Sequence, residues 1–354
     1  MSNISSRKAD HIDLCISGDV GFQHKTNLFE CVEFVHDALP ELALDEIDTS
    51  SSFAGYPIQA PLIIAAMTGG VDRAEEINRD LAKTAQKYGI GFAFGSQRPW
   101  LSNGIREGYL VRDVAPDVLL LGNLGIVQAA QTSTEAIQEM IKETGVHALC
   151  IHLNPAMELV QPEGDQDFRQ GMDTLRRLQD LGIPIIVKET GCGLSRKVAQ
   201  RIKDIGIQWV DISGAGGTSW VAVETHRAQD EKHQLGHTFW DWGIPTAASV
   251  AQLHGLDLGI CATGGIQNGL MIAKAIALGA SCGGMARAFL QSYAHGGVEE
   301  LERRIEQVIA EIKITMLLVG APNITALQQT ALVIDPKLLR WVPKESMLRA
   351  RLLD

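Results

Sequence analysis

The feature that most constrains this chain is a series of eight short apolar runs, each followed by a segment with helical character. The runs cover residues 61–67, 90–95, 117–123, 147–153, 183–189, 207–213, 256–265 and 280–286. They are continuously apolar instead of alternating with polar residues, which is typical of parallel strands buried on both faces. Eight strand–helix units in succession predict an α/β fold of the (β/α)8 TIM-barrel type.

The segments between the runs carry the helical period most clearly at residues 168–181, 195–206 and 299–319. Their expected buried faces are formed by Phe168, Met172, Leu175 and Leu178, by Val198, Ile202 and Ile205, and by Leu301, Ile305, Val308, Ile312 and Met316. Ser195 is a good N-cap, and glycines stand where helices should end, at Gly89, Gly145, Gly182, Gly206 and Gly279. A doubly wound sheet fits less well because no GxGxxG turn follows the first run.

The domain organisation predicted from this pattern is a single domain over residues 1–354. The barrel should occupy about residues 58–320, with residues 1–57 forming an N-terminal extension over the barrel mouth and the last residues forming a helical tail. No low-complexity segment or linker divides the chain.

Composition excludes several classes of protein. Of the 354 residues 45% are hydrophobic and 21% are charged, so the chain is not intrinsically disordered. A formal charge of −11 argues against binding nucleic acid through a basic surface. No apolar run is long enough for a membrane helix or stands at the N-terminus as a signal peptide, and the six cysteines are scattered without a CxxC pair. We therefore expect a cytoplasmic protein with free thiols.

The residues that end the apolar runs are the strongest sign of an enzyme. Glycine and polar residues are concentrated at positions 67–70, 95–98, 122–125, 152–158, 188–191, 213–220, 263–269 and 284–287. The active sites of TIM barrels are built at the carboxyl ends of the strands. The glycines in 263–269 and 284–287 place backbone N–H groups where they can bind an anion, in the loops that commonly bind phosphate in such barrels. The alternative is that these glycines only permit tight turns.

Lys188 ends the fifth run and should point into the barrel mouth. There it could stabilise an anionic ring, form a Schiff base or act as a base. The alternative is an ordinary ion pair with a neighbour such as Glu189 or Asp211.

The end of the fourth run offers a further group of candidates. His152 and Asn154 are two residues apart and face the same way on an extended segment. Glu158 is a candidate ligand for Mg²⁺, which usually takes one or two carboxylates together with substrate phosphates. Near the N-terminus, Arg7 and Lys8 are either a solubilising pair or a clamp for a diphosphate at the mouth.

These motifs, taken in order, resemble one enzyme family. They are SSRKADHI, AAMTGG, FGSQRP, GNLG, HLNP…E…QPEGD, VKETGCGLS, DISGAGGTSW…E…R, ATGGI and GMAR, and they extend from Arg7 to about Leu290. The set is similar to the type 2 isopentenyl-diphosphate Δ-isomerases. The resemblance implies an FMN-dependent TIM barrel that interconverts isopentenyl and dimethylallyl diphosphate, usually as a tetramer or octamer. It also implies a flavin reduced by NAD(P)H and Mg²⁺ that bridges protein and diphosphate. Charge and hydropathy already predict no nucleic-acid or membrane partner.

The resemblance also implies roles for individual residues. Lys188 and His152 would be catalytic, with Lys188 at the N1/C2 edge of the flavin, and Glu158 would bind Mg²⁺. The flavin would be bound by Ala66, Met67, Thr68, Ser96, Asn123, Lys188, Ser213, Thr218, Gly264, Gly265, Ala286 and Arg287. The substrate would be held by Arg7, Lys8, Ser96, Gln97, Arg98, His152, Asn154 and Met157.

One position departs from the family pattern. The family usually has Gln immediately before the metal-binding glutamate, where this chain has Met157. A thioether cannot carry a proton. Three explanations are then open. Reduced flavin carries out the proton transfer while Met157 only shapes the pocket, another group replaces the missing Gln, or the activity is weakened. Gln161 is nearby in sequence but matches a different family position.

Three other functions are compatible with such a barrel. A 2-hydroxy-acid oxidase would need a histidine base late in the barrel, and residues 261–269 contain none. A nucleotide dehydrogenase would need a catalytic cysteine, for which only Cys192 is placed. The third is a flavin-binding relative without isomerase activity, which is suggested by Met157 at the position where the family usually has Gln.

Overall fold

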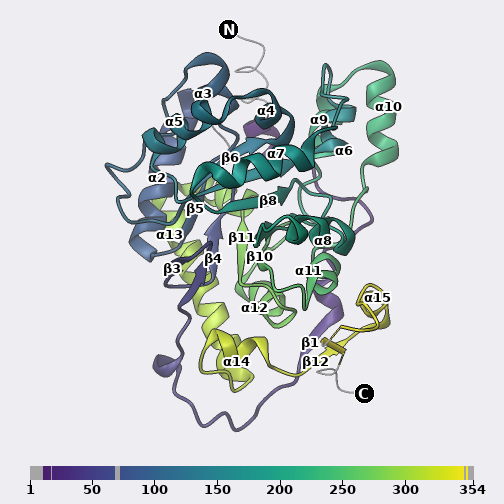
Figure 1. Cartoon of the computed structure of the whole chain (residues 1–354). Helices are drawn as coiled ribbons and strands as arrows, with labels where there is room; N and C mark the ends of the chain where they lie inside the picture. Colours follow the sequence, from purple (N-terminus) through teal and green to yellow (C-terminus); the bar gives the residue numbers. More distant parts are fainter. Residues whose placement is uncertain (1–10, 17, 68–71, 347, 350–354) are drawn as a thin grey trace.

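A closed barrel of eight parallel strands forms the centre of the molecule (Figure 1). The computed structural model describes residues 11–16, 18–67, 72–346 and 348–349. The barrel strands are β4 (Leu62–Ile64), β5 (Gly91–Ala93), β6 (Leu120–Gly125), β7 (Ala148–Leu153), β8 (Ile185–Glu189), β9 (Trp209–Asp211), β10 (Gly259–Ala262) and β11 (Cys282–Met285). Each strand pairs with the next in sequence, and β11 pairs with β4 to close the barrel. Every predicted apolar run contains or overlaps one of these strands, so the predicted fold class is confirmed.

The continuous apolar runs are explained by burial on both sides of each strand. On β8, Ile186 points into the barrel, where it joins a cluster with Cys150, Cys261 and Cys282. Its neighbours Ile185 and Val187 belong instead to the larger core between the barrel and the helices. Because both faces are dry, every position on such a strand favours an apolar side chain.

Helices cover the outside of the barrel (Figure 1). They are α2 (Asp72–Tyr88), α3 (Arg98–Asn103), α4 (Ile126–Gln131), α5 (Thr134–Thr144), α6 (Pro155–Val160), α7 (Gly171–Leu178), η3 (Gln179–Leu181), α8 (Arg196–Asp204), α9 (Trp220–Arg227), α10 (Asp230–Phe239), α11 (Thr246–Leu253), α12 (Gly269–Ala277) and α13 (Arg287–Leu318). Figure 1 shows α10 standing out from the body of the molecule beside α6 and α9. Among the described residues, no helix combines the length and apolar character needed to cross a membrane.

The three predicted helical segments are all present, with shifted ends. Segment 168–181 becomes α7 and η3, and Phe168 precedes the helix. Segment 195–206 becomes α8, where the Ser195 side chain accepts a hydrogen bond from the Val198 backbone N–H, as expected of an N-cap. Segment 299–319 is the second part of α13, which is kinked at Gly296 and Gly297.

The N-terminal extension divides between the two ends of the barrel. Residues 11–16 and 18–22 reach the mouth, where His11, Gly21 and Phe22 line the central cavity. The chain then forms η1 (Phe29–Cys31), β1 (Val32–Phe34), η2 (Leu44–Glu46) and the hairpin of β2 (Ser51–Phe53) and β3 (Tyr56–Ile58).

The hairpin closes the opposite end of the barrel. Phe53 and Ile58 belong to the barrel-interior cluster, and Phe53 packs edge-on against Trp209, the first residue of β9. The expectation that all of residues 1–57 covers the mouth is therefore corrected. Apolar side chains at the hairpin seal the open bottom of the barrel, which would otherwise expose the interior to water.

The C-terminal tail is only partly helical. It consists of α14 (Ile324–Gln328), β12 (Leu332–Ile334) and α15 (Pro336–Leu339). Strand β12 pairs antiparallel with β1, with Phe34 opposite Leu332. This pairing ties the tail to the N-terminal extension. All six cysteines are free thiols, as expected.

The apolar stripe on α13 yields a stability prediction. Ile305 is fully buried, whereas Ile314 on the same helix is 46% exposed. Ile305→Ala should lower the free energy of unfolding by about 2–5 kcal/mol because it leaves a cavity in the core. Ile314→Ala is the matched control and should change it by less than about 0.5 kcal/mol. Urea unfolding followed by circular dichroism measures both, and equal losses would contradict the assigned packing.

Candidate active site

A cavity of about 510 Å³ opens at the carboxyl ends of the barrel strands. All eight strands or the loops that follow them contribute to its wall, together with residues of the N-terminal extension. This volume lies within the range of about 300–1,000 Å³ that is usual for small-molecule sites. The structure therefore places the cavity where barrel enzymes carry out their chemistry.

Most of the residues predicted for the site line this cavity. They are Ala66, Met67, Ser96, Arg98, Asn123, His152, Asn154, Met157, Glu158, Lys188, Ser213, Thr218, Gly264, Gly265, Ala286 and Arg287. Arg7, Lys8 and Thr68 lie outside the described residues.

Gln97 is the exception among the described candidates. Its side chain is fully buried and does not line the cavity. Its Oε1 accepts the Asn123 backbone N–H at 2.9 Å, and its own backbone N–H donates to the Asn123 carbonyl at 2.7 Å. This side chain turns inward and joins β6 to the segment after β5. The substrate contact expected of Gln97 stays a prediction.

Lys188 forms a buried ion pair at the cavity wall. Its Nζ lies 2.7 Å from Asp211 Oδ2, and each side chain is only 9% exposed. Burial alone lowers the pKa of Lys188, but the charge and hydrogen bond of Asp211 outweigh it and raise the pKa above its ordinary value. A Schiff base or a general base requires a neutral amine, so the structure favours the cationic role. Lys188 thus forms an ion pair with Asp211 and also lines the cavity, so the two alternatives considered for this lysine do not exclude each other.

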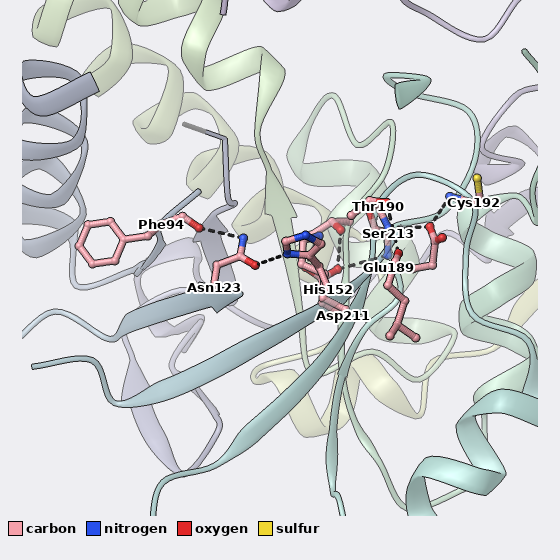
Figure 2. A network of polar contacts seen from close by, with 11 residues as sticks. Phe94, Asn123, His152, Glu189, Thr190, Cys192, Asp211 and Ser213 are labelled. Atoms are coloured by element: carbon pink, nitrogen blue, oxygen red, sulfur yellow. Dashed lines mark hydrogen bonds and ion pairs between the residues drawn. The ribbon is translucent and has the colours of Figure 1, made fainter. Parts of the chain in front are cut away.

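His152 is held by a chain of hydrogen bonds that Figure 2 shows. Asn123 Nδ2 donates to the Phe94 carbonyl at 3.0 Å, and Asn123 Oδ1 lies 2.8 Å from His152 Nδ1. Because a carbonyl oxygen can only accept, the Asn123 amide must turn its oxygen toward His152, whose Nδ1 is then the donor. The ring is thereby fixed in orientation at the end of β7.

Glu158 is a buried carboxylate at the start of α6 that still reaches the cavity. Its Oε1 accepts from Asn154 Nδ2 at 2.7 Å, and its Oε2 accepts from the Asp165 backbone N–H at 2.9 Å. In the described part of the chain, no three His, Cys, Asp or Glu side chains gather to hold a metal by themselves. A single held carboxylate suits Mg²⁺ that takes its other ligands from water and from substrate phosphates.

The glycine-rich loops after β9 and β10 form one side of the cavity. The backbone of Gly264 has a φ of +103°, and a Cβ there would overlap the Gly214 carbonyl oxygen. A Cβ on Gly217 would in the same way overlap the backbone of Gly265. These two loops therefore pack backbone against backbone, as glycine alone allows. Ala286 and Arg287, at the N-terminus of α13, line the adjoining wall, where a helix favours an anion.

The N-terminal extension is fastened to the mouth by polar contacts. Arg287 donates from Nε to the Cys15 carbonyl at 2.8 Å and from Nη2 to the Gly18 carbonyl at 2.7 Å. His11 Nε2 lies 2.7 Å from Glu224 Oε1, and the Glu224 side chain is fully buried. Arg287 thus holds this segment as well as lining the expected phosphate site.

The comparisons with known proteins agree with this geometry. Residues 128–334 match the family model described as FMN-dependent dehydrogenase. The isopentenyl-diphosphate delta-isomerase of Thermococcus onnurineus is 44% identical over 98% of this chain and 96% of its own length. That of Methanosarcina mazei is 40% identical over 94% of this chain and 93% of its own length. That of Halobacterium salinarum is 39% identical over 96% of this chain and 96% of its own length. The chain belongs to the type 2, FMN-dependent isopentenyl-diphosphate delta-isomerase family.

Solved structures of more distant flavoproteins share the fold. A flavocytochrome b2 variant with benzoylformate is 19% identical with a TM-score of 0.70, over 98% of this chain and 88% of its own. A mandelate oxidase variant with an FMN adduct is 17% identical with a TM-score of 0.64, over 91% and 95%. At such identities the likeness concerns the fold alone. This cavity differs from the expected 2-hydroxy-acid oxidase pattern, since the histidines among its described lining residues, His11 and His152, come from the N-terminal extension and β7.

Several cavity residues were not predicted as site residues. They include His11, Gln128, Gln161, Thr190, Trp220 and Thr263. Asp211, expected only as a possible ion-pair partner, is outside the lining and reaches the site through its contact with Lys188. Thr263 directly follows β10, so its place at a strand end was an available signal. His11 and Trp220 belong to the motifs SSRKADHI and DISGAGGTSW, but no role in the site was assigned to either residue.

Glu189 is a buried carboxylate that the expected chemistry does not use. Its Oε2 accepts the backbone N–H groups of Thr190 at 2.6 Å and Cys192 at 2.5 Å, as Figure 2 shows. Burial raises the pKa of Glu189 from 4.5 to about 7, against the opposing effect of these hydrogen bonds. Its role is to shape the loop that carries Thr190 and Gly191 to the cavity.

This pKa predicts how stability depends on pH. Between about pH 4.5 and 7 the folded protein keeps the Glu189 proton that the unfolded chain has lost, so stability falls as pH rises. Glu189→Gln removes this loss and keeps an oxygen acceptor for the loop. The variant's free energy of unfolding, relative to wild type, should rise by about 3 kcal/mol between pH 4.5 and pH 7.5. Urea unfolding at both pH values tests this, and a pH-independent difference would disprove the assigned pKa.

Proposed function

We propose that this protein is an FMN- and magnesium-dependent isomerase that interconverts isopentenyl diphosphate and dimethylallyl diphosphate. The observation that carries the proposal is one cavity that contains the glycine-rich loops, the Lys188 cation and the Glu158 carboxylate. Membership of the isomerase family supports it. The substrate is a small diphosphate, and NAD(P)H is proposed as the reductant of the flavin.

The cavity fits FMN through its glycines and its cation. A Cβ at Gly264 would meet the backbone of Gly214, so this part of the cavity wall is backbone without side chains, which suits a cofactor phosphate. We propose that Gly264, Gly265, Ala286 and Arg287 bind the phosphate, and that the ring is contacted by Ala66, Met67, Ser96, Asn123, Lys188, Ser213 and Thr218, with Thr68 beyond the described residues. Bound reduced FMN supplies an electron-rich ring that exchanges protons with the substrate.

The diphosphate is assigned to the opposite part of the wall. Arg98, His152 and Asn154 line the cavity there and present a cation and polar groups to an anion. Glu158 is the proposed ligand for Mg²⁺, and Arg7 and Lys8 remain proposed clamps from the extension. Local cations and metal thus compensate for the net charge of −11, which repels a polyanion over the molecule as a whole.

The chain's own side chains prepare the site for moving a double bond. The reaction adds a proton at one carbon and removes one from another, so the intermediate state carries positive charge and must be kept from water. Met157 and Trp220 line the cavity and provide apolar surface for the isoprene group. Since Met157 cannot carry a proton, its proposed role is to shape this surface, and Lys188 sets the charge near the flavin.

The family resemblance also supports a homo-oligomer, either a tetramer or an octamer, that works in the cytoplasm. Multi-angle light scattering measures the assembly directly. A monomer would remove this part of the proposal without affecting the site.

The proposed activity is tested by an anaerobic assay with isopentenyl diphosphate, FMN and Mg²⁺, with and without a flavin reductant. We expect dimethylallyl diphosphate only when the flavin is reduced. Bound and reduced FMN without product would refute the isomerase activity of this chain and identify a flavin-binding relative. Met157→Gln is the companion variant, and a gain of activity only in that variant would show that Met157 disables the site.

The proposed metal site gives a separate prediction. EDTA should abolish activity, and added Mg²⁺ should restore it. Glu158→Gln should lower kcat/KM at least about a hundredfold because a charged metal ligand is lost. The matched control is Glu163→Gln, an exposed carboxylate in the same segment, which should leave kcat/KM within about twofold of wild type. Full turnover in EDTA would remove Glu158 from this role.

A further inference from the structure

We propose that Asp211 is a positioning residue that keeps the Lys188 ammonium charged and fixed in place at the flavin. The inference rests on the proposed function because it takes FMN as the occupant of the cavity. It extends that function by proposing that a residue of β9, Asp211, determines the charge and position of Lys188 on β8.

The ion pair is built into the barrel by strand register. Lys188 and Asp211 are paired positions on the neighbouring strands β8 and β9. Both side chains are therefore at the same height of the barrel, and Nζ and Oδ2 meet at 2.7 Å without any loop having to order. Rigid strands place functional groups more accurately than loops do.

The carboxylate is itself held from two further directions. Asp211 Oδ1 accepts the Thr263 hydroxyl at 2.5 Å and the Ser213 backbone N–H at 3.2 Å. One oxygen is thus used to anchor Asp211 to β10 and the β9 loop, while the other binds Lys188. This division fixes the rotation of the carboxylate, so the position of Nζ is determined by three adjacent strands.

The other ionisable groups around Lys188 do not replace Asp211. The thiols of Cys150 on β7 and Cys261 on β10 are in electrostatic contact with Lys188, and burial keeps Cys150 neutral by raising its pKa to about 12. Cys261 also has a raised pKa, through its hydrogen bond with Cys282. His152 is opposite Lys188 on β7 and is bonded to Asn123. Glu189 is next on β8 but directs Oε2 to the loop N–H groups.

Removal of the carboxylate should therefore neutralise the lysine. A buried ammonium without a partner has a depressed pKa, because burial disfavours the charged form. Burial already acts in this direction on Lys188, and Asp211 is what reverses it. In Asp211→Asn the lysine should lose its proton within the neutral to alkaline range, although the side chain is still present.

The test measures the reduction potential of bound FMN against pH for wild type and Asp211→Asn. A lysine that becomes protonated only when the flavin is reduced takes up one extra proton per two electrons. We expect this steeper pH dependence in the variant above about pH 7 and not in wild type. Turnover should fall about tenfold or more near pH 9 and recover near pH 6, with KM little changed.

A second readout needs neither FMN nor turnover. Pyridoxal 5′-phosphate forms an imine only with a neutral amine, and borohydride makes the product permanent for mass spectrometry. In the apoprotein at pH 7.5, labelling of Lys188 should be about tenfold faster in Asp211→Asn than in wild type. Equal rates would overturn the proposal even if the holoprotein could not be prepared.

Two controls separate positioning from general structural damage. Glu189→Gln removes a neighbouring buried carboxylate and should leave both the pH dependence of the potential and the labelling of Lys188 as in wild type. In a Lys188→Ala background, Asp211→Asn should have no further effect on the potential. Additive effects of the two substitutions would mean that Asp211 acts independently of Lys188 and would overturn the proposal.

The outcomes also distinguish this inference from the proposed function. If wild-type protein binds FMN but makes no dimethylallyl diphosphate, the isomerase proposal fails while the potential and labelling measurements still decide the role of Asp211. If wild type isomerises normally and Asp211→Asn matches it at every pH, only the Asp211 inference fails.

Discussion

Closure of the barrel between β11 and β4 is the constraint on which the rest of the structure depends. The Cα atoms of Gly283 and Leu62 are partners in this last ladder, which joins the end of the fold to its beginning. A closed parallel barrel leaves no strand edge unpaired and brings all eight carboxyl ends to one rim. Residues more than two hundred positions apart, such as Met67 and Ala286, consequently line one cavity.

The cavity holds both a buried cation and a buried carboxylate, a combination that the acidic composition of the chain does not reveal. Each charged group that is buried there has a partner that limits the cost of taking it out of water. Lys188 has Asp211, and Glu158 has the Asn154 amide together with a backbone N–H. These partners also fix the orientation of the groups they neutralise. The same partners therefore serve stability and function: each offsets the cost of burying a charged group and also fixes the direction in which that group points.

The two ends of the barrel are closed by the same stretch of chain in different ways. At the bottom, the β2–β3 hairpin inserts apolar side chains such as Phe53. At the mouth, the extension is attached through polar contacts of Arg287 and Glu224, and it leaves a cavity. An apolar plug suits a permanent closure, whereas hydrogen bonds at a rim allow a wall that also faces a polar ligand.

The order of strands and helices could be predicted from the sequence because each strand is buried on both faces. Each strand is therefore a continuous apolar run, whichever strand it pairs with. For the same reason the site residues at strand ends, such as Lys188 and His152, could be named before their surroundings were known. Contacts between distant segments could not be predicted in this way. Gln97 was expected in the cavity and instead turns under the rim to Asn123, because a side chain's direction depends on its neighbouring strand. The choice of Asp211 over Glu189 as the partner of Lys188 was likewise made only by tertiary structure, since strand register decides which carboxylate shares its height and side of the barrel.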